Sequence, residues 1–216
     1  MKKYIRKLKE HHIYIPFIIF RRLSIWARIL FFLKIIPTQK RKIFLGTRPK
    51  IYGLSKIKLP QNFSIGDNLW LEAVTDYRGI VHTPHLEIGN NFIASDSLHI
   101  GCAGKITIGT NVLIGSKVHI TDHLHGFYNG EIQSSPDSPP AERPLTPDGV
   151  VTIGDNVWIG ENVVVLPNTK IGSGSIIGAN SIVSKNIPSN VIAVGAPAQP
   201  IKKWDEQQKT WIAIHH

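Results

Sequence analysis

The sequence is poor in cysteine, in long apolar runs and, near its start, in acidic side chains. Cys102 is the only cysteine among 216 residues, so no disulfide can form within the chain and a reducing compartment is expected. Its sequence surroundings are not distinctive, and we interpret it as a packed thiol rather than a nucleophile. The apolar stretches between charged residues are shorter than the roughly 20 residues that a membrane-spanning helix needs. The sequence therefore predicts neither a disulfide framework nor a spanning helix.

Acidic side chains are scarce in residues 1–50, where Glu10 alone accompanies 14 Lys and Arg, which leaves a net charge of +13. Residues 51–216 hold 14 Asp and Glu against 11 Lys and Arg, a net charge of −3, which argues against a nucleic-acid-binding surface there. In residues 1–50 the basic residues alternate with Trp, Phe, Leu and Ile, as in helices that lie in a membrane interface. We predict a basic amphipathic helical segment on a membrane surface; packing against its own oligomer or a partner is the alternative.

The C-terminal half carries an aliphatic residue at every sixth position, namely Ile153, Ile159, Val165, Ile171, Ile177 and Val183. Two residues before each stands a small or β-branched residue, and three residues after each stands Asn or, once, Gly. A period of six fits no helical face, but it fits a short strand followed by a corner. Asn and Gly tolerate positive φ, so the repeated slot marks the corner.

Three sides of six residues make a triangular coil, in which each aliphatic residue points inward and stacks on the one 18 residues later. Because no coil can bury its own apolar face, stability comes from the contacts between neighbouring coils. The sequence therefore predicts an all-β fold, a parallel β-helix over residues 51–200. We expect residues 201–216 to form a short C-terminal helix.

The repeat stops after Ile120 and resumes at Val151, which predicts an excursion loop over residues 121–150. A long excursion from a strict coil is usually functional. It begins with Asp122, His123 and His125, and His119 lies just before it. Histidine is the side chain best suited to move a proton near neutral pH, so a general base is the favoured interpretation. A zinc site made by the three histidines, or histidines solvated on a loop, are the alternatives. His82, His85 and His99 are isolated in the sequence, and surface or strand-edge positions are expected for them.

These features together resemble the hexapeptide-repeat acyltransferases, over about residues 60–203. The resemblance rests on the repeat, on the segment from Ile120 to Gly126 (ITDHLHG) and on the stretch from Val151 to Ala198. The group that acetylates maltose and galactosides, and within it the enzymes that modify cell-surface polysaccharides, is the most similar. The resemblance implies a left-handed β-helix and a homotrimer with its sites between subunits. It also implies acetyl-CoA as co-substrate and no metal.

Specific residues match the family pattern. His123 corresponds to the catalytic histidine, with His125 as the second choice. The positions that the resemblance assigns to coenzyme A are Gly160, Ala179, Ser184, Lys185 and Lys202. Where the galactoside enzymes place an acceptor-binding Asn, this chain has Ser95 and Asp96, which argues against free galactosides or maltose as acceptors.

We therefore expect an acetyl-CoA-dependent O-acetyltransferase that modifies a sugar hydroxyl of a cell-surface or lipid-linked saccharide, in the cytoplasm at the inner face of the membrane. Three alternatives stay open: N-acetylation of an amino sugar, a zinc hydratase of the same fold, and a trimeric scaffold without enzymatic activity.

Overall fold

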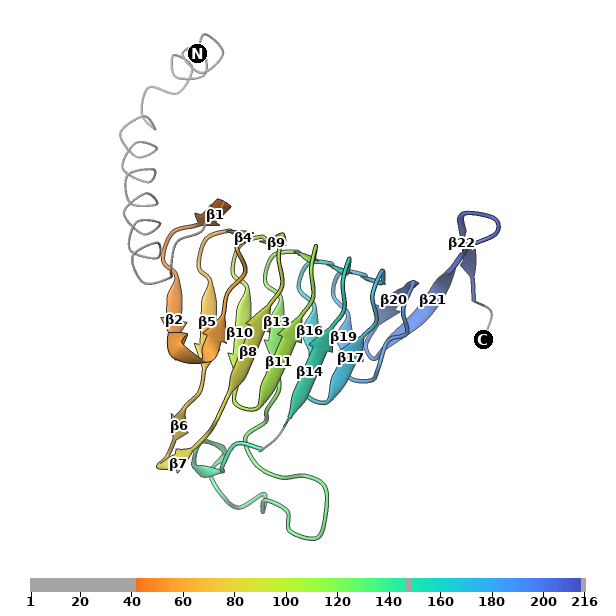
Figure 1. The fold of residues 1–216 in the computed structure, drawn as a ribbon. Coiled ribbons are helices and arrows are strands. Elements are labelled where there is room, and N and C mark those ends of the chain that lie inside the picture. The colour runs from red at the N-terminus through yellow and green to blue at the C-terminus, as the bar shows by residue number, and fades with distance from the viewer. Residues whose placement is uncertain (1–41, 147–148, 215–216) are drawn as a thin grey trace, which may run out of the picture.

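The computed structural model describes residues 42–146 and 149–214, and these form a parallel β-helix with three sheets along its sides (Figure 1). Sheet A contains β1 (Lys42–Leu45), β4 (Asn62–Ile65), β9 (Phe92–Ala94), β12 (Leu113–Ile114), β15 (Trp158–Ile159), β18 (Ile176–Ile177), β20 (Val191–Gly195), β21 (Ala198–Asp205) and β22 (Thr210–Ala213). Sheet B contains β2 (Lys50–Tyr52), β5 (Trp70–Ala73), β10 (His99–Cys102), β13 (His119–Thr121), β16 (Val164–Val165) and β19 (Ile182–Val183). Sheet C contains β3 (Ile57–Lys58), β8 (His85–Ile88), β11 (Lys105–Ile108), β14 (Val150–Ile153) and β17 (Thr169–Ile171).

From β4 to β20 the coil visits sheets A, B and C in turn, and each of its strands pairs in parallel with the equivalent strand of a neighbouring coil. Ile159 pairs with Ile177, and Val165 pairs with Val183, each 18 residues further along. These pairs confirm the predicted stacking of one coil on the next. Strand β1 pairs with β4, so the pairing already begins at Lys42, within the range that the charge distribution assigned to the basic segment.

The six-residue repeat supplies the core. Its aliphatic residues from Ile153 to Val183 are at most 2% exposed. The small or β-branched residues two positions earlier are buried as well, and the three that carry a hydroxyl group, Thr169, Ser175 and Ser181, use it in a hydrogen bond with the backbone. The Ser175 hydroxyl donates to the Pro188 carbonyl at 2.7 Å, and the Thr169 hydroxyl donates to the Leu166 carbonyl at 2.7 Å. Burial of these polar groups therefore leaves no hydrogen bond unmade at these corners.

The corners follow the predicted backbone chemistry. Asn156, Asn162, Asn168 and Asn180 have φ between 56° and 60°, and Gly174 has φ of 70°. The left-handed region strains most side chains, but Asn and Gly tolerate it. This confirms the predicted role of the Asn/Gly slot at five of its six positions; Asn186, in the last coil, does not have a positive φ.

Two segments leave the coil. Residues between β5 and β8 form a hairpin, β6 (Asp76–Tyr77) and β7 (Ile80–Val81), which the repeat pattern had not predicted. The predicted excursion leaves after β13 and contains a short 3-10 helix, η2 (Pro140–Glu142); another, η1 (Leu54–Lys56), joins β2 to β3. Figure 1 shows the hairpin and the excursion at the same end of the strands, and the Tyr77 hydroxyl donates to the Ala141 carbonyl at 2.9 Å. The two segments therefore pack on each other.

The expectation of a C-terminal helix is wrong. Strands β21 and β22 form an antiparallel hairpin that extends sheet A beyond the last coil. Asp205 accepts hydrogen bonds from the backbone N–H groups of Gln207 and Gln208 at the turn, and the rings of Trp204 and Trp211 pack edge to face at 5.4 Å. The open edge of β20 offers unpaired backbone groups, and pairing with that edge outweighs local helix preference. The predicted N-terminal helical segment lies mainly in residues 1–41, outside the described residues. Among the described residues, no helix has the length and apolar character needed to cross a membrane.

Candidate functional site

The strongest candidate base, His123, lies just past the end of β13, beside a buried carboxylate. Asp122 is 0% exposed, and its Oδ1 atom lies 2.8 Å from His123 Nδ1. The same carboxylate accepts the backbone N–H of Ala103 at 2.8 Å and that of Gly104 at 2.9 Å. Three donors therefore hold the carboxylate in place, and Nδ1 donates to it in the neutral imidazole. The lone pair is left on Nε2, which is the arrangement a general base needs.

His123 opens into a cavity of about 400 Å³ on the outer side of sheet B. The cavity is lined by Glu72, His99, Gly101, His119, Thr121, His123, Leu124, His125 and Leu166. The lining combines five outward positions of the neighbouring strands β5, β10 and β13 with the first residues of the excursion and with Leu166, which follows β16. The first residues of the excursion thus form one wall of the cavity.

His125, the second choice for the base, lines the same cavity but has a different partner. Its Nδ1 atom lies 3.2 Å from the Tyr77 hydroxyl of the β6–β7 hairpin. That hydroxyl already donates to Ala141, so it accepts from His125. A neutral hydroxyl stabilises an imidazolium less than a carboxylate does, so the geometry favours His123 over His125 as the base.

His99 is not isolated, contrary to the expectation from the sequence. It is the register partner of His119 on β13, and the two Nδ1 atoms are 3.1 Å apart. Burial, together with the imidazoles of His119 and His123, lowers the pKa of His99 from 6.5 to about 4. Burial and then His123 also lower the pKa of His119. Both rings are therefore neutral at physiological pH, and one Nδ1 donates to the other.

A second cavity, of about 480 Å³, surrounds two of the residues assigned to coenzyme A. It is lined by Ser95, Leu113, Gly115, Trp158, Gly160, Glu161, Ile176, Ile177, Gly178 and Ala179. We call it the sheet A groove. A Cβ atom on Gly160 would lie 2.6 Å from the Ala179 backbone nitrogen, so successive coils touch there through backbone atoms. Leu113, Trp158 and Ile176 are register partners that form an apolar wall along the groove.

Residues 151–185 match the family model described as bacterial transferase hexapeptide (six repeats). A protein of Escherichia coli strain K12 named for O-acetyl transfer in lipopolysaccharide biosynthesis, WbbJ, is 44% identical over 156 residues, which cover 72% of this chain and 76% of the relative. The chain belongs to the hexapeptide-repeat acyltransferases.

Another sequence relative and a solved structure also match over much of the chain. The galactoside O-acetyltransferase of E. coli strain K12 is 36% identical over 151 residues, 68% of this chain and 66% of the relative. A solved structure of AntD, an N-acyltransferase from Bacillus cereus, has a TM-score of 0.55 and 22% identity over 78% of this chain and 84% of that chain, a likeness of fold alone. Membership of the family implies a left-handed β-helix, as predicted.

Of the remaining positions predicted for coenzyme A, Lys202 lies near the sheet A groove, whereas Ser184 and Lys185 do not. Lys202, on β21, pairs with Ile192, which pairs with Ile176 of the sheet A groove, so Lys202 lies at the end of the apolar wall. Ser184 and Lys185 follow β19 of sheet B, at the opposite end of its strands from the groove. Within residues 42–146 and 149–214, no hydrogen bond or ion pair joins Ser184 or Lys185 to the lining of the groove.

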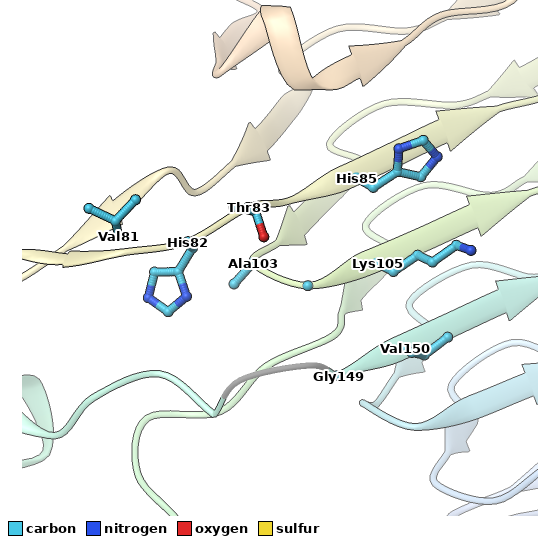
Figure 2. Close-up of a pocket in the computed structure, with 9 residues that line it drawn as sticks. Val81, His82, Thr83, His85, Ala103, Lys105, Gly149 and Val150 are labelled. Atoms are coloured by element: carbon cyan, nitrogen blue, oxygen red, sulfur yellow. The ribbon is translucent and has the colours of Figure 1, made fainter.

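The two histidines of the early coils that were expected at the surface lie near a third cavity, of about 390 Å³. Figure 2 shows His82 and His85 on the same segment, with Ala103 between His82 and Lys105, and the side chains of His85 and Lys105 extending away from His82. In the described part of the chain, no group of three His, Cys, Asp or Glu side chains is arranged to hold a metal ion.

The sequence pattern indicates no role for Asp122, Glu72 or His99. In the structure Asp122 is hydrogen-bonded to His123, and Glu72 and His99 line the cavity beside it. The position of Asp122 directly before the candidate base was the only available signal.

Cys102 is fully buried, and its burial, together with the nearby Asp122 carboxylate, raises the pKa of its thiol. This agrees with a packed rather than a reactive cysteine.

Proposed function

We propose that this protein transfers the acetyl group of acetyl-CoA to a hydroxyl group of a cell-surface or lipid-linked saccharide. The observation that carries the proposal is the Asp122–His123 pair, whose free Nε2 atom faces a cavity lined by polar side chains. The names of the E. coli relatives, an O-acetyl transferase of lipopolysaccharide biosynthesis and a galactoside O-acetyltransferase, support the choice of a sugar hydroxyl.

In the proposed reaction His123 Nε2 takes the proton of the sugar hydroxyl while the hydroxyl oxygen attacks the thioester carbonyl carbon. The resulting tetrahedral intermediate expels the coenzyme A thiolate, and the imidazolium returns the proton to the sulfur. The buried Asp122 carboxylate stabilises the positive charge that His123 carries between these steps. Thiolate is a good leaving group, so the reaction needs no covalent intermediate with the enzyme.

We infer that the sheet A groove holds the pantetheine arm of acetyl-CoA. Gly160 and Ala179 have no side chain or only a methyl group, so they leave room for the arm at the base of the groove. Leu113, Trp158 and Ile176 form the apolar wall that would contact it. Lys202 stands beyond this wall with a positive charge for a phosphate group. Lys185 and Ser184 would serve the same coenzyme only from another position, because they lie at the far end of the sheet B strands.

We further propose a homotrimer with the active site between subunits. The groove lies where the chain enters the strands of sheet B, whereas His123 and Leu166 lie where it leaves them. The base and the groove of one chain therefore lie at opposite ends of the sheet B strands. A neighbouring copy that sets its groove against the His123 cavity would bring the two substrates together.

The charge of +13 on residues 1–50 supports a peripheral position at the inner face of the cytoplasmic membrane. We expect the full chain to sediment with phosphatidylglycerol vesicles and not with phosphatidylcholine vesicles at low salt. A variant without residues 1–41 should stay in the supernatant in both cases. Equal sedimentation of the two proteins with the anionic vesicles would contradict the assignment.

The function is tested by incubating the purified protein with acetyl-CoA and a panel of p-nitrophenyl glycosides and bacterial oligosaccharides, with mass spectrometry of the products. We expect one acetyl group on a sugar oxygen and an equal amount of free coenzyme A. The variant His123→Ala should turn over about 10²–10⁴-fold more slowly, because it lacks the base.

His85→Ala is the matched control for this variant, since His85 is an exposed histidine of sheet C that the mechanism does not use. It should retain wild-type turnover. Acetylated product at the wild-type rate from His123→Ala would remove His123 from the mechanism, and no acetylated saccharide with the wild type would refute the proposed function.

A further inference from the structure

The outer face of sheet B carries two adjacent columns of side chains next to His123. In the first column the register partners are Lys50, Trp70, His99 and His119. In the second they are Tyr52, Glu72, Gly101 and Thr121. Because Gly101 has no side chain, the second column has a hollow at its centre, between Glu72 and Thr121.

Two imidazole nitrogens face this hollow. A Cβ atom built on Gly101 would lie 4.0 Å from His123 Nε2 and 4.0 Å from His99 Nε2, and 3.3 Å from His123 Cε1. Glu72 is the register partner of Gly101 on the neighbouring strand and lines the same cavity. The hollow is therefore bordered by the candidate base just past the end of β13, by His99 on the same strand as Gly101 and by Glu72 on β5.

His99 and Glu72 are held in place by Trp70. The Trp70 ring stacks on His99 with a centroid distance of 4.4 Å and an interplanar angle of 19°. Its Nε1–H group donates to Glu72 Oε2 at 3.0 Å. On the other side, His119 Nδ1 lies 3.1 Å from His99 Nδ1. These contacts leave His99 Nε2 and one carboxylate oxygen of Glu72 available toward the cavity.

We propose that His99 and Glu72 bind a second hydroxyl of the acceptor sugar, next to the hydroxyl that His123 deprotonates, so that the enzyme selects acceptors with a vicinal diol. A sugar in the cavity, on the outer side of the His123 ring, would place one hydroxyl at His123 Nε2 and its neighbour at His99 Nε2 or the Glu72 carboxylate. A half-buried site built to bond a hydroxyl discriminates against an acceptor that lacks it, since its polar groups are then left unpaired. Trp70 is a positioning residue in this arrangement. The inference rests on the proposed function and names its substrate class.

The test compares a p-nitrophenyl glycoside that the wild type acetylates with its monodeoxy analogues at the carbons beside the acetylated one. The wild type should prefer the diol acceptor in kcat/KM by about 10–100-fold. His99→Phe keeps a flat ring on Trp70 without nitrogen, and Glu72→Gln keeps the size of the side chain without its charge. Each should raise the KM for the glycoside about 10-fold and reduce the preference for the diol to a few-fold, with the KM for acetyl-CoA unchanged.

Trp70→Phe keeps a ring for stacking and should fall between the wild type and Trp70→Ala in its KM for the glycoside. Trp211→Ala, which removes a tryptophan from the C-terminal hairpin, is the matched control and should leave the preference intact. If His99→Phe and Glu72→Gln still reject the deoxy acceptor as the wild type does, the subsite is wrong although the acetyl transfer stands.

The opposite case is separated by binding. If the wild type acetylates no glycoside, the proposed function fails, and saturation-transfer NMR with the same diol and deoxy pair then tests the subsite alone. Preferential binding of the diol by the wild type, lost in His99→Phe, supports the subsite. Equal binding of both glycosides, or none by the wild type, overturns it.

Discussion

At the scale of single residues, the most consequential contact joins two neighbours in the sequence. In a regular strand Asp122 and His123 would point to opposite faces of the sheet. The strand ends at Thr121, and the chain turns so that the Asp122 carboxylate reaches both His123 Nδ1 and the backbone of the preceding coil. The histidine could be found from its position in the excursion, but its partner could not, because the partner's orientation depends on the turn.

Asp122→Asn is expected to lower kcat by about 10²–10⁴-fold, because an amide neither stabilises the imidazolium nor fixes the Nδ1–H tautomer. The amide NH₂ would also face a backbone N–H group, so the free energy of unfolding should fall by about 1–3 kcal/mol. Steady-state kinetics at saturating acetyl-CoA and urea unfolding measure the two effects.

Asp155→Asn provides the comparison for this variant. Asp155 also accepts a backbone N–H, that of Thr110, but at a corner away from the cavity. It should keep wild-type kcat. Wild-type kcat in Asp122→Asn would mean that His123 acts without its buried partner.

At the scale of elements, the coils could be predicted from the sequence because each coil repeats the same backbone conformation, a short strand followed by a tight corner. Short strands of two to five residues alternate with corners at which one residue has a positive φ. The Asn or Gly at such a corner makes its position recognisable in the sequence. The β6–β7 hairpin and the C-terminal hairpin were not predicted. Each depends on pairing partners, the hairpin's own second strand or the free edge of β20, and no local period encodes such a partner.

The sheet A groove is tested by filling it. Ala179→Leu adds a branched side chain at an exposed corner of the groove, and we expect it to raise the KM for acetyl-CoA about 10–100-fold. The fold should be retained, because the new side chain points into open space rather than into the core. Isothermal titration with coenzyme A and steady-state kinetics measure the effect.

Ser189→Leu is the matched control, since Ser189 stands beside Gly172 at another corner as Ala179 stands beside Gly160. Its KM for acetyl-CoA should equal that of the wild type. An unchanged KM in Ala179→Leu would place coenzyme A elsewhere on the coil.

At the scale of the whole molecule, the proposed trimer predicts that two variants, each inactive alone, complement each other when they form mixed trimers. His123→Ala chains keep the groove, and Ala179→Leu chains keep the base, so a mixed trimer contains some sites with both parts intact. Random mixing in a cyclic trimer restores about one quarter of the sites, the product of two halves. We expect co-expressed chains, assayed at low acetyl-CoA, to approach this fraction of wild-type activity.

Separately purified variants that are combined without subunit exchange should show only the average of the two parents. Sedimentation equilibrium of the wild type should give the mass of three chains. Activity of the co-expressed mixture at the parental average would mean that each chain holds a complete site by itself.

The sequence by itself determined the coil, its inward residues, its corners and the place where it is interrupted, because all of these follow from a period that one strand and one corner must repeat. It also pointed to the histidines at the start of the interruption, because histidine is the side chain suited to proton transfer, and the resemblance to the acyltransferase family then favoured His123 among them. Only the tertiary structure decided which residues surround it. Asp122, Glu72 and His99 come together because coils 20 to 50 residues apart in the chain stack side by side, and that stacking carries no sequence signal beyond the repeat itself.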